Sequence, residues 1–248
     1  MSANYDTSCT TISYEGTIYQ LNYANTAIEN SSTVMGIVFK NGVVTISEKI
    51  LQSKAVIPGS NPSVYAITPT IGIAICGLLP DGRNIVSRAK LEASSYLKTF
   101  GIPITGQTLT ERLAIYVHSH TCHWGTRPFG ACVFISSIER DNYHLYMLET
   151  SGNFFEYYST ANGKGRQFVK AEVEKDNFAI RNLNVQEGLV KALKIMMKSF
   201  EGEKDVEYDV GLISTETKGR FMIVGLNELK VFIQRAKAEI EEDKKKTS

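Results

Sequence analysis

The sequence has few of the features that mark secreted, membrane-spanning or metal-dependent proteins. Its 248 residues include only four cysteines, Cys9, Cys76, Cys122 and Cys132, which are scattered without paired spacing. Cys76 and Cys132 lie inside apolar runs, which predicts buried free thiols in a reducing compartment. No apolar run approaches the roughly 18 residues of a membrane span, and no charged-then-apolar segment opens the chain. We therefore expect a protein of the cytoplasm and nucleus with no membrane partner.

An excess of charge of either sign is also absent. Lys and Arg number 27 and Asp and Glu number 26, which leaves a net charge of +1. This balance argues against a dedicated nucleic-acid surface, so we expect no nucleic-acid partner. A chain of this length can bury most of its apolar surface and needs neither a metal ion nor disulfides to fold. We accordingly expect no cofactor.

Two motifs with candidate chemistry fall short of what that chemistry requires. Within a segment rich in histidine, helical spacing places His118 and Cys122 on one face and His120 and His123 on another. Each face offers two ligands where a structural zinc site uses four, so we predict no metal site. The segment Gly163–Gly165 precedes a predicted helix but lacks the earlier glycine and the following Ser or Thr of a phosphate-binding loop. We therefore interpret Gly163–Gly165 as a glycine turn.

Hydrophobic periodicity predicts antiparallel sheets between helical layers. Helices are expected in pairs between runs of strands, instead of alternating with them one for one, which disfavours a doubly wound parallel sheet. No internal repeat or long linker is present, so we expect one domain over residues 1–248, with a charged tail over residues 239–248. Predicted strands are 34–40, 43–48, 64–67, 71–76, 131–138, 143–148, 154–158, 206–213 and 220–224; predicted helices are 20–30, 81–100, 108–123, 166–177, 185–200 and 227–240.

Local signals predict specific turns and caps. Asn41-Gly42 between two apolar runs is typical of a type I′ hairpin turn, in which both central residues have positive φ. Asp81 is placed to cap a helix that ends at Gly101, and the sequence from Thr108 to Glu111 matches a capping box. Asn227 is the predicted cap of the last helix.

The stretch before the first hairpin is the most informative. Leu21, Ala24 and Ile28 recur at helical spacing, with Ala27 beside them, and such a stripe must pack against something. Ser32 and Thr33 follow directly, where a hydrolase could use a terminal hydroxyl residue whose own α-amine serves as the base. Some thirty residues precede them, so the amine is not free. Cleavage before Ser32 or Thr33 would instead produce an active protease, and this alternative stays open.

Ordered matches along almost the whole chain resemble the proteasome α-type subunits. Within that family, Glu29–Thr33, Ser53-Lys54, Gly59–Asn61 and Leu145–Leu148 are most similar to the type-3 branch, which occupies the seventh ring position. The positions that carry the family resemblance are Tyr5-Asp6, Ser8, Thr10, Ser13, Gly16, Ile18, Gln20, Tyr23-Ala24, Ala27-Ile28, Asn30–Thr33, Gly36-Ile37, Lys40–Val44, Glu48-Lys49, Gly77-Leu78, Asp81–Arg83, Glu92-Ala93, Arg127–Gly130 and Gly163–Gly165.

The resemblance implies an α+β fold, a four-layer αββα sandwich of two antiparallel sheets of the N-terminal-nucleophile hydrolase type. It implies a place in a seven-membered outer ring of the 20S core particle, stacked on a catalytic β ring, with roles in ring assembly, axial pore gating and activator docking for ubiquitin-dependent protein degradation. Expected partners are neighbouring α subunits, β-ring subunits and a regulatory particle or other activators. Residues 1–33 would form the gate segment and leader helix. The implied gate and leader residues are Tyr5, Asp6, Ser8, Gln20, Tyr23 and Ala24, and the implied ring contacts are Leu21, Ala27, Ile28, Arg127 and Pro128.

The same resemblance predicts that the chain has no catalytic residues. Aligned on Gly42, the nucleophile of the β-type subunits falls at Ser32 in mid-chain and their aspartate falls at Glu48. Their lysine falls near Ser63-Val64, where this chain has none. Many α subunits have a lysine near Ser63 that captures an activator carboxylate, and its absence argues against docking at this subunit's pocket. A ring scaffold without β partners is a further alternative.

Two departures from the family pattern lie near the gate. The usual Ser-Pro-Asp-Gly turn is Ser13–Gly16 with Tyr14 and Glu15 at its centre, so the turn lacks the proline that fixes it. The usual Tyr-Asp-Arg is Tyr5-Asp6-Thr7, which removes a cation. We expect the details of gating to differ at these two places.

Overall fold

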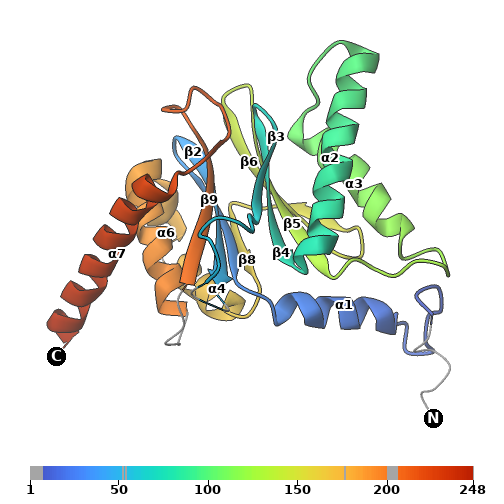
Figure 1. Ribbon diagram of the computed structural model, residues 1–248, viewed down its shortest axis with the longest axis horizontal. Coiled ribbons are helices and arrows are strands. Elements are labelled where there is room, and N and C mark those ends of the chain that lie inside the picture. The colour runs from blue at the N-terminus through green and yellow to red at the C-terminus, as the bar shows by residue number, and fades with distance from the viewer. Residues whose placement is uncertain (1–7, 52, 54, 176, 200–205, 248) are drawn as a thin grey trace.

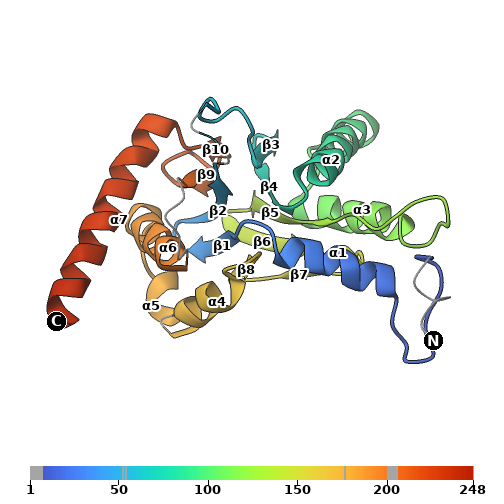
Figure 2. The ribbon, with the colours of Figure 1, turned by 60° about the horizontal axis from the view of Figure 1, so that its bottom comes forward.

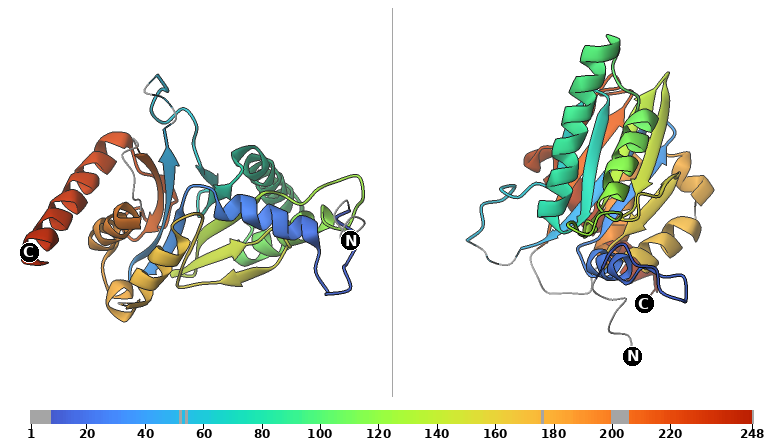
Figure 3. Two further views of the ribbon diagram at one scale, coloured as in Figure 1. Left: turned by 90° about the horizontal axis from the view of Figure 1, so that it is seen from below. Right: turned by 90° about the vertical axis from the view of Figure 1, so that its right-hand side faces the viewer.

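Two antiparallel sheets lie face to face between two layers of helices. The computed structural model describes residues 8–51, 53, 55–175, 177–199 and 206–247. One sheet has the order β10-β9-β2-β1-β8 and the other β3-β4-β5-β6-β7. Helices α2 and α3 cover the second sheet, and α4, α6 and α7 lie on the opposite side of the molecule against the first (Figure 1; Figure 3). The predicted four-layer sandwich is confirmed.

The bounds of the elements follow the predicted order with two additions, the short strand β8 and the short helix α5. The strands are β1 (Val34–Phe39), β2 (Gly42–Ile50), β3 (Val64–Thr68), β4 (Ile71–Gly77), β5 (Ala131–Glu139), β6 (Asn142–Leu148), β7 (Phe154–Glu156), β8 (Ser159–Asn162), β9 (Val206–Ser214) and β10 (Met222–Ile223). The helices are α1 (Tyr19–Glu29), α2 (Leu79–Phe100), α3 (Gly106–Ser119), α4 (Arg166–Lys175), α5 (Asn177–Arg181), α6 (Val185–Ser199) and α7 (Leu226–Thr247).

Three apolar cores hold the layers together. Alternate residues of β5 point into two different cores. Phe134 belongs to the core between the sheets, whereas Val133 and Ile135 belong to the core under α2 and α3. The third core joins the first sheet to α6 and α7 and includes Leu193 and Val210. Strand β4 is buried along six consecutive residues, as its unbroken apolar run predicts.

The predicted type I′ turn at Asn41-Gly42 is wrong. Phe39 pairs with Gly42, so the two-residue loop is Lys40-Asn41, and neither Asn41 nor Gly42 has a positive φ. The Asn41 side chain instead accepts a hydrogen bond from the Val185 backbone N–H at 2.8 Å, which positions the start of α6. Gly42 is required by close packing, because a Cβ there would lie 2.4 Å from the Ile213 carbonyl oxygen.

The positive-φ turn occurs elsewhere in the chain. Arg140 and Asp141, with φ of 47° and 66°, connect β5 to β6 between the paired residues Glu139 and Asn142. Asp tolerates this left-handed conformation, whereas Arg adopts it seldom. The dipeptide preference therefore located a hairpin correctly but assigned the wrong physical role to its glycine.

Three predicted helix caps are also wrong. The α2 helix begins at Leu79, so Asp81 lies inside its first turn instead of preceding it. Thr105 caps α3 by accepting a hydrogen bond from the Thr108 N–H at 3.2 Å, which moves the cap three residues earlier than the capping box predicts. Asn227 lies within α7. The predicted end of α2 is confirmed, because Gly101 adopts a left-handed conformation with φ of 71°.

The charged tail continues α7 as a helix to Thr247 and is not a frayed end. The Lys194 Nζ lies 3.3 Å from a carboxylate oxygen of Glu239 and 3.0 Å from one of Asp243, so α7 is fastened to α6. Lys198 pairs with the same Asp243 carboxylate at 3.0 Å. Among the described helices, none is both long and apolar enough to cross a membrane.

Candidate functional site

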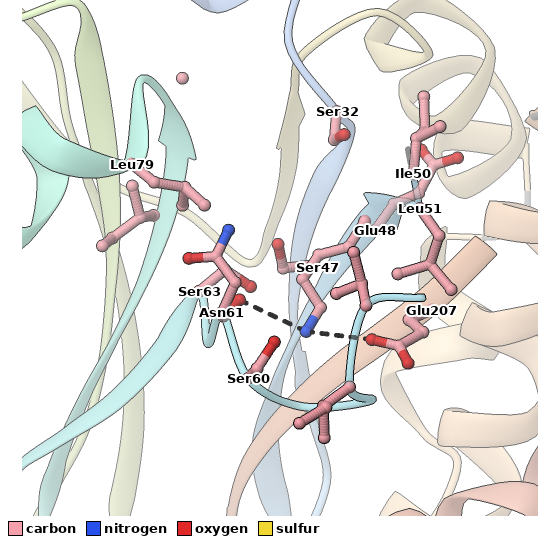
Figure 4. Close-up of a pocket in the computed structure, with 15 residues that line it drawn as sticks. Ser32, Ser47, Glu48, Ile50, Leu51, Ser60, Asn61, Ser63, Leu79 and Glu207 are labelled. Atoms are coloured by element: carbon pink, nitrogen blue, oxygen red, sulfur yellow. Dashed lines mark hydrogen bonds and ion pairs between the residues drawn. The ribbon is translucent and has the colours of Figure 1, made fainter. Parts of the chain in front are cut away.

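A cleft of about 340 Å³ opens between the two sheets where β1 begins. Its walls include Ser32 before β1, Glu48 and Lys49 on β2, Ser63 before β3, Ile75 on β4, Leu79 at the start of α2 and Glu207 on β9 (Figure 4). Helix α1 crosses the molecule beside this end of the sheets (Figure 1; Figure 2). The structure thus brings Ser32 and Glu48 together, as the alignment on Gly42 predicts.

The backbone at Ser32 and Thr33 is tied into the fold on both sides. The Thr33 amide N–H donates to Glu48 Oε2 at 3.3 Å, and the Glu48 N–H donates to the Thr33 carbonyl oxygen at 2.9 Å. The Gly165 N–H donates to Thr33 Oγ1 at 3.0 Å, and the Lys164 N–H donates to the Ser31 carbonyl oxygen at 2.9 Å. A nucleophile of this type needs a free amine at Ser32 or Thr33, whereas both nitrogens here are backbone amides, and that of Thr33 is hydrogen-bonded to Glu48.

The glycines of Gly163–Gly165 explain how this turn can approach the chain so closely. Gly163 has φ of 99°, and a Cβ there would lie 2.5 Å from the Ser32 carbonyl oxygen. A Cβ at Gly165 would lie 2.8 Å from Thr33 Oγ1. The turn therefore holds the backbone that leads from α1 into β1, which is consistent with its interpretation as a glycine turn and not a phosphate-binding loop.

Glu48 is a buried carboxyl group with incomplete hydrogen bonding. Its side chain is 3% exposed, and among the described residues its Oε1 atom has no hydrogen-bond partner. Burial raises the pKa of Glu48 above its ordinary value, although hydrogen bonds with Thr33 and the nearby Lys164 charge act in the opposite direction. The folded state therefore holds a proton on Glu48 more strongly than the unfolded chain does.

We expect Glu48→Gln to change the pH dependence of stability. A carboxyl group whose pKa is raised by folding contributes stability below its unfolded pKa, and this contribution is lost as pH rises through the folded pKa. The neutral glutamine avoids that loss and retains an acceptor for the Thr33 N–H. We would measure the free energy of unfolding of both proteins by urea denaturation. The value for the variant minus the value for the wild type should increase as the pH rises from 4.5 to 7.5. The exposed Glu241→Gln should show no such gain, and a constant difference for Glu48→Gln would contradict the argument.

Ser63 occupies the region where a catalytic lysine is missing, and its role is structural. Its backbone N–H and its Oγ both donate to Asp209 Oδ2, at 2.8 Å and 2.9 Å. This pair of bonds anchors the loop between β2 and β3 to strand β9. Ser63 itself is 1% exposed.

The cleft does contain a lysine, which the sequence analysis did not identify as part of the site. Lys49 Nζ lies 2.9 Å from Asp209 Oδ1. It also lies 3.5 Å from Glu207 Oε2 and donates to the Asn61 carbonyl oxygen at 3.4 Å (dashed lines in Figure 4). Two carboxylates thus neutralise the ammonium group. The signal that would have located it is the cross-strand pair Lys49–Glu207, which requires knowing that β2 pairs with β9.

The predicted leader residues are only partly brought to the site. Ile28 is 2% exposed and packs into the core between the sheets, whereas Leu21, Ala24 and Ala27 remain partly exposed on α1. Other predicted residues lie away from the cleft: Gln20 is partly exposed on α1, Tyr23 is 50% exposed, and the Ser8 hydroxyl pairs with that of Thr10. Tyr5 and Asp6 lie outside the described residues.

Arg127 and Pro128, the predicted ring contacts beyond α1, take part in an internal contact. The Arg127 guanidinium binds both oxygens of Asp81, at 2.6 Å and 2.8 Å, and the Gly130 N–H donates to Asp81 Oδ2 at 2.8 Å. Partial burial would raise the pKa of Asp81, but the hydrogen bonds from Arg127 and Gly130 lower it. Pro128 is buried beside this pair. Their role in a ring stays a prediction.

No group of three or more His, Cys, Asp or Glu side chains within the described ranges is arranged to hold a metal ion. The three histidines around the C-terminal end of α3 each direct Nδ1 to a backbone carbonyl oxygen: His118 to Ser151, His120 to Tyr116 and His123 to Ser119. Backbone contacts therefore set the orientation of these rings.

Comparison with known proteins identifies close relatives. The family described as "Proteasome: Proteasome subunit" matches residues 28–213. The chain is 40% identical to the rice (Oryza sativa subsp. japonica) "Proteasome subunit alpha type-3" over 98% of this chain and 99% of that protein. It is 39% identical to the Arabidopsis thaliana protein of the same name, over 98% and 97% of the two chains. It is 37% identical to the Saccharomyces cerevisiae "Probable proteasome subunit alpha type-7", over 98% and 86%. The resemblance to α-type subunits, and to the type-3 branch among them, is confirmed.

Proposed function

This chain belongs to the proteasome subunit family, and we propose that it is a non-catalytic α-type subunit of the 20S core particle. Its proposed work is to help assemble the outer ring at the seventh position, to contribute to the axial gate and to support activator docking during ubiquitin-dependent degradation. Neighbouring α subunits, β-ring subunits and an activator or regulatory particle are its proposed partners. We propose the cytoplasm and nucleus as its location.

The observation that carries this proposal is the leader, which runs unbroken through the candidate nucleophile. Helix α1 ends at Glu29, and the chain runs on through Ser31–Thr33 into β1. The nitrogens of Ser32 and Thr33 are therefore backbone amides, and that of Thr33 donates to Glu48. The lysine that would tune that base is missing at Ser63, and the lysine nearby is neutralised by Glu207 and Asp209. An amide nitrogen is not basic, so it cannot accept the proton of a hydroxyl nucleophile.

The exposure of α1 supports a role in contacts between subunits. Its outer surface presents Tyr23 and the partly exposed Leu21, Ala24 and Ala27, while only Ile28 is fully inserted into the core. An apolar stripe that is half-covered in the single chain fits a helix that completes its burial against a neighbour. The cleft itself offers little to capture an activator carboxylate, because the Lys49 ammonium group already pairs with the Asp209 carboxylate.

We expect Ser32→Ala to leave the peptidase activities of the assembled particle unchanged. The substitution removes a hydroxyl group that is adjacent to an amide and has no base, so no chemical step depends on it. Particles isolated through the tagged chain, wild-type or variant, would be assayed with peptide substrates for each activity present. The intact mass of the chain from the same particles should include the leader, and native mass spectrometry should find β subunits.

Three results would contradict the proposal. Loss of a peptidase activity in the Ser32→Ala particle, or a mature chain that begins at Ser32 or Thr33, would show an active protease subunit. A ring that contains α subunits and no β subunits would show a scaffold outside the core particle. A matched control is Ser31→Ala, whose hydroxyl donates to the Ile28 carbonyl oxygen at 2.7 Å and is outside any catalytic alignment.

A further inference from the structure

A histidine in the last turn of α3 and a cysteine just after that helix form a contact pair on the surface. Cys122 Sγ lies 3.3 Å from His118 Nε2, and His118 Nδ1 lies 3.0 Å from the Ser151 carbonyl oxygen. A carbonyl oxygen only accepts, so Nδ1 carries the ring proton and Nε2 directs its lone pair at the thiol. The order nucleophile, base and orienting acceptor is that of an activated cysteine.

The orienting acceptor comes from a different part of the fold and is held rigidly. Ser151 lies in the turn between β6 and β7, which is closed by a 2.8 Å bond from the Glu149 N–H to the Asn153 carbonyl oxygen. Gly152 has φ of 90°, and a Cβ there would lie 2.7 Å from the Cβ of His118. Only glycine therefore lets this turn approach α3 closely enough for the Ser151 carbonyl to reach the imidazole.

Exposure distinguishes this thiol from the other three, all of which lie in the described part of the chain. Cys9, Cys76 and Cys132 are buried, and the Cys9 thiol donates to the carbonyl oxygens of His123 and Thr126. Cys122 is exposed, so a reagent in solution can reach its sulfur. A thiol that is exposed and hydrogen-bonded to an oriented imidazole has the microenvironment of a reactive cysteine.

We propose that Cys122 is a modification site, which reacts with low-molecular-weight disulfides of the glutathione class to form a mixed disulfide. The thiol proton moves to His118 Nε2, and the thiolate attacks one sulfur of the reagent. A bond forms between the protein sulfur and that sulfur as the reagent's own S–S bond breaks. The departing thiolate takes the proton back from His118. The protein thiol is oxidised, half of the reagent is reduced to a thiol, and no other reactant is needed.

The test is the rate of mixed-disulfide formation at Cys122 with oxidised glutathione at pH 7, followed by the intact mass and peptide mapping of the full-length chain. We expect the native wild-type chain to react about tenfold faster than His118→Gln, because the base is lost. His123→Gln is the matched control: this exposed histidine also directs Nδ1 to a backbone carbonyl, and its ring contacts no thiol in the described part of the chain, so the rate of the variant should equal that of the wild type. Cys122→Ser should abolish the modification under native conditions.

A denatured control separates activation by His118 from simple exposure, with His118→Gln as the variant for comparison. The wild-type chain in urea should react at Cys122 as slowly as the variant, a comparison that does not depend on any variant folding. Equal rates at Cys122 in the native wild type, in His118→Gln and in urea would overturn the proposal.

Discussion

Gly42→Ala should destabilise the chain more than any other substitution proposed for it, by on the order of 3 kcal/mol or more. The new Cβ would lie 2.4 Å from the Ile213 carbonyl oxygen and 2.5 Å from Cγ2 of Val185. The first of these atoms belongs to the backbone of β9, which is paired with β2 along its whole length, so it cannot move without breaking the sheet. The measurement is the free energy of unfolding in urea.

The control for this prediction is Gly125→Ala. Gly125 lies in an exposed loop, and a Cβ there would meet nothing within 4 Å, so the change should stay within about 0.5 kcal/mol. If Gly42→Ala cost no more than Gly125→Ala, the close approach of β2, β9 and α6 would not be as described. The result also bears on the site, because Gly42 begins the strand that carries Glu48 and Lys49 into the cleft.

Asp209→Ala should have the second largest effect, a loss of about 3 kcal/mol with release of the loop between β2 and β3. One carboxylate accepts from the Ser63 N–H and hydroxyl and also pairs with Lys49, and hydrogen bonds to a charged group contribute about 1.5–3 kcal/mol each. Without it, the partners of Lys49 among the described residues are Glu207 and the Asn61 carbonyl oxygen. Urea denaturation gives the energy, and amide hydrogen exchange over residues 55–63 reports the loop.

Asp209→Asn provides the graded comparison. The amide oxygen still accepts from Ser63, but the charge opposite Lys49 is removed, so the loss should fall between those of the wild type and the alanine variant. Protection of residues 55–63 should fall in the same order. An unchanged exchange pattern in Asp209→Ala would show that the loop is held by contacts other than this carboxylate.

The two substitutions differ in what they test about function. Gly42→Ala disturbs the sandwich that places α1 beside the cleft, whereas Asp209→Ala leaves the sheets intact and opens one wall of the cleft. If the cleft takes no part in catalysis in the proposed α-type subunit, particles containing Asp209→Ala should keep their peptidase activities. A change in activation of those particles would indicate instead that the loop wall contributes to activator docking.

Short-range patterns were enough to predict the order of the elements. The apolar run of β4 is buried, and the helical stripes of α2 and α6 place Ile85, Ala89, Leu189 and Leu193 in the core. Phe100, at the end of the predicted α2 stripe, is instead 55% exposed. The stop at Gly101 was predictable for a similar reason, because a left-handed C-terminal residue is a property of the backbone alone. The leader and Ser32 could be aligned because the spacing from Gly42 is local in sequence.

What failed depended on contacts between distant residues. Asp81 is a poor cap because Arg127 and Gly130, more than forty residues away, bind its carboxylate. Strand β8 is polar in sequence and forms because β1 offers it an open edge. The place of Lys49 in the cleft follows from the pairing of β2 with β9, which brings Glu207 and Asp209 beside it.

The sequence by itself therefore determined the layered α+β fold, the mid-chain position of Ser32 and the absence of the lysine at Ser63. Only the tertiary structure decided which charges meet in the cleft, why Gly42 and Gly163 must be glycine, and that His118 and Cys122 meet with the Ser151 carbonyl behind them. The physical reason is that periodicity and local alignment record which side of each element is buried. The partner across a sheet or turn is selected by packing between segments as far apart as Ser63 and Asp209, which are 146 residues apart.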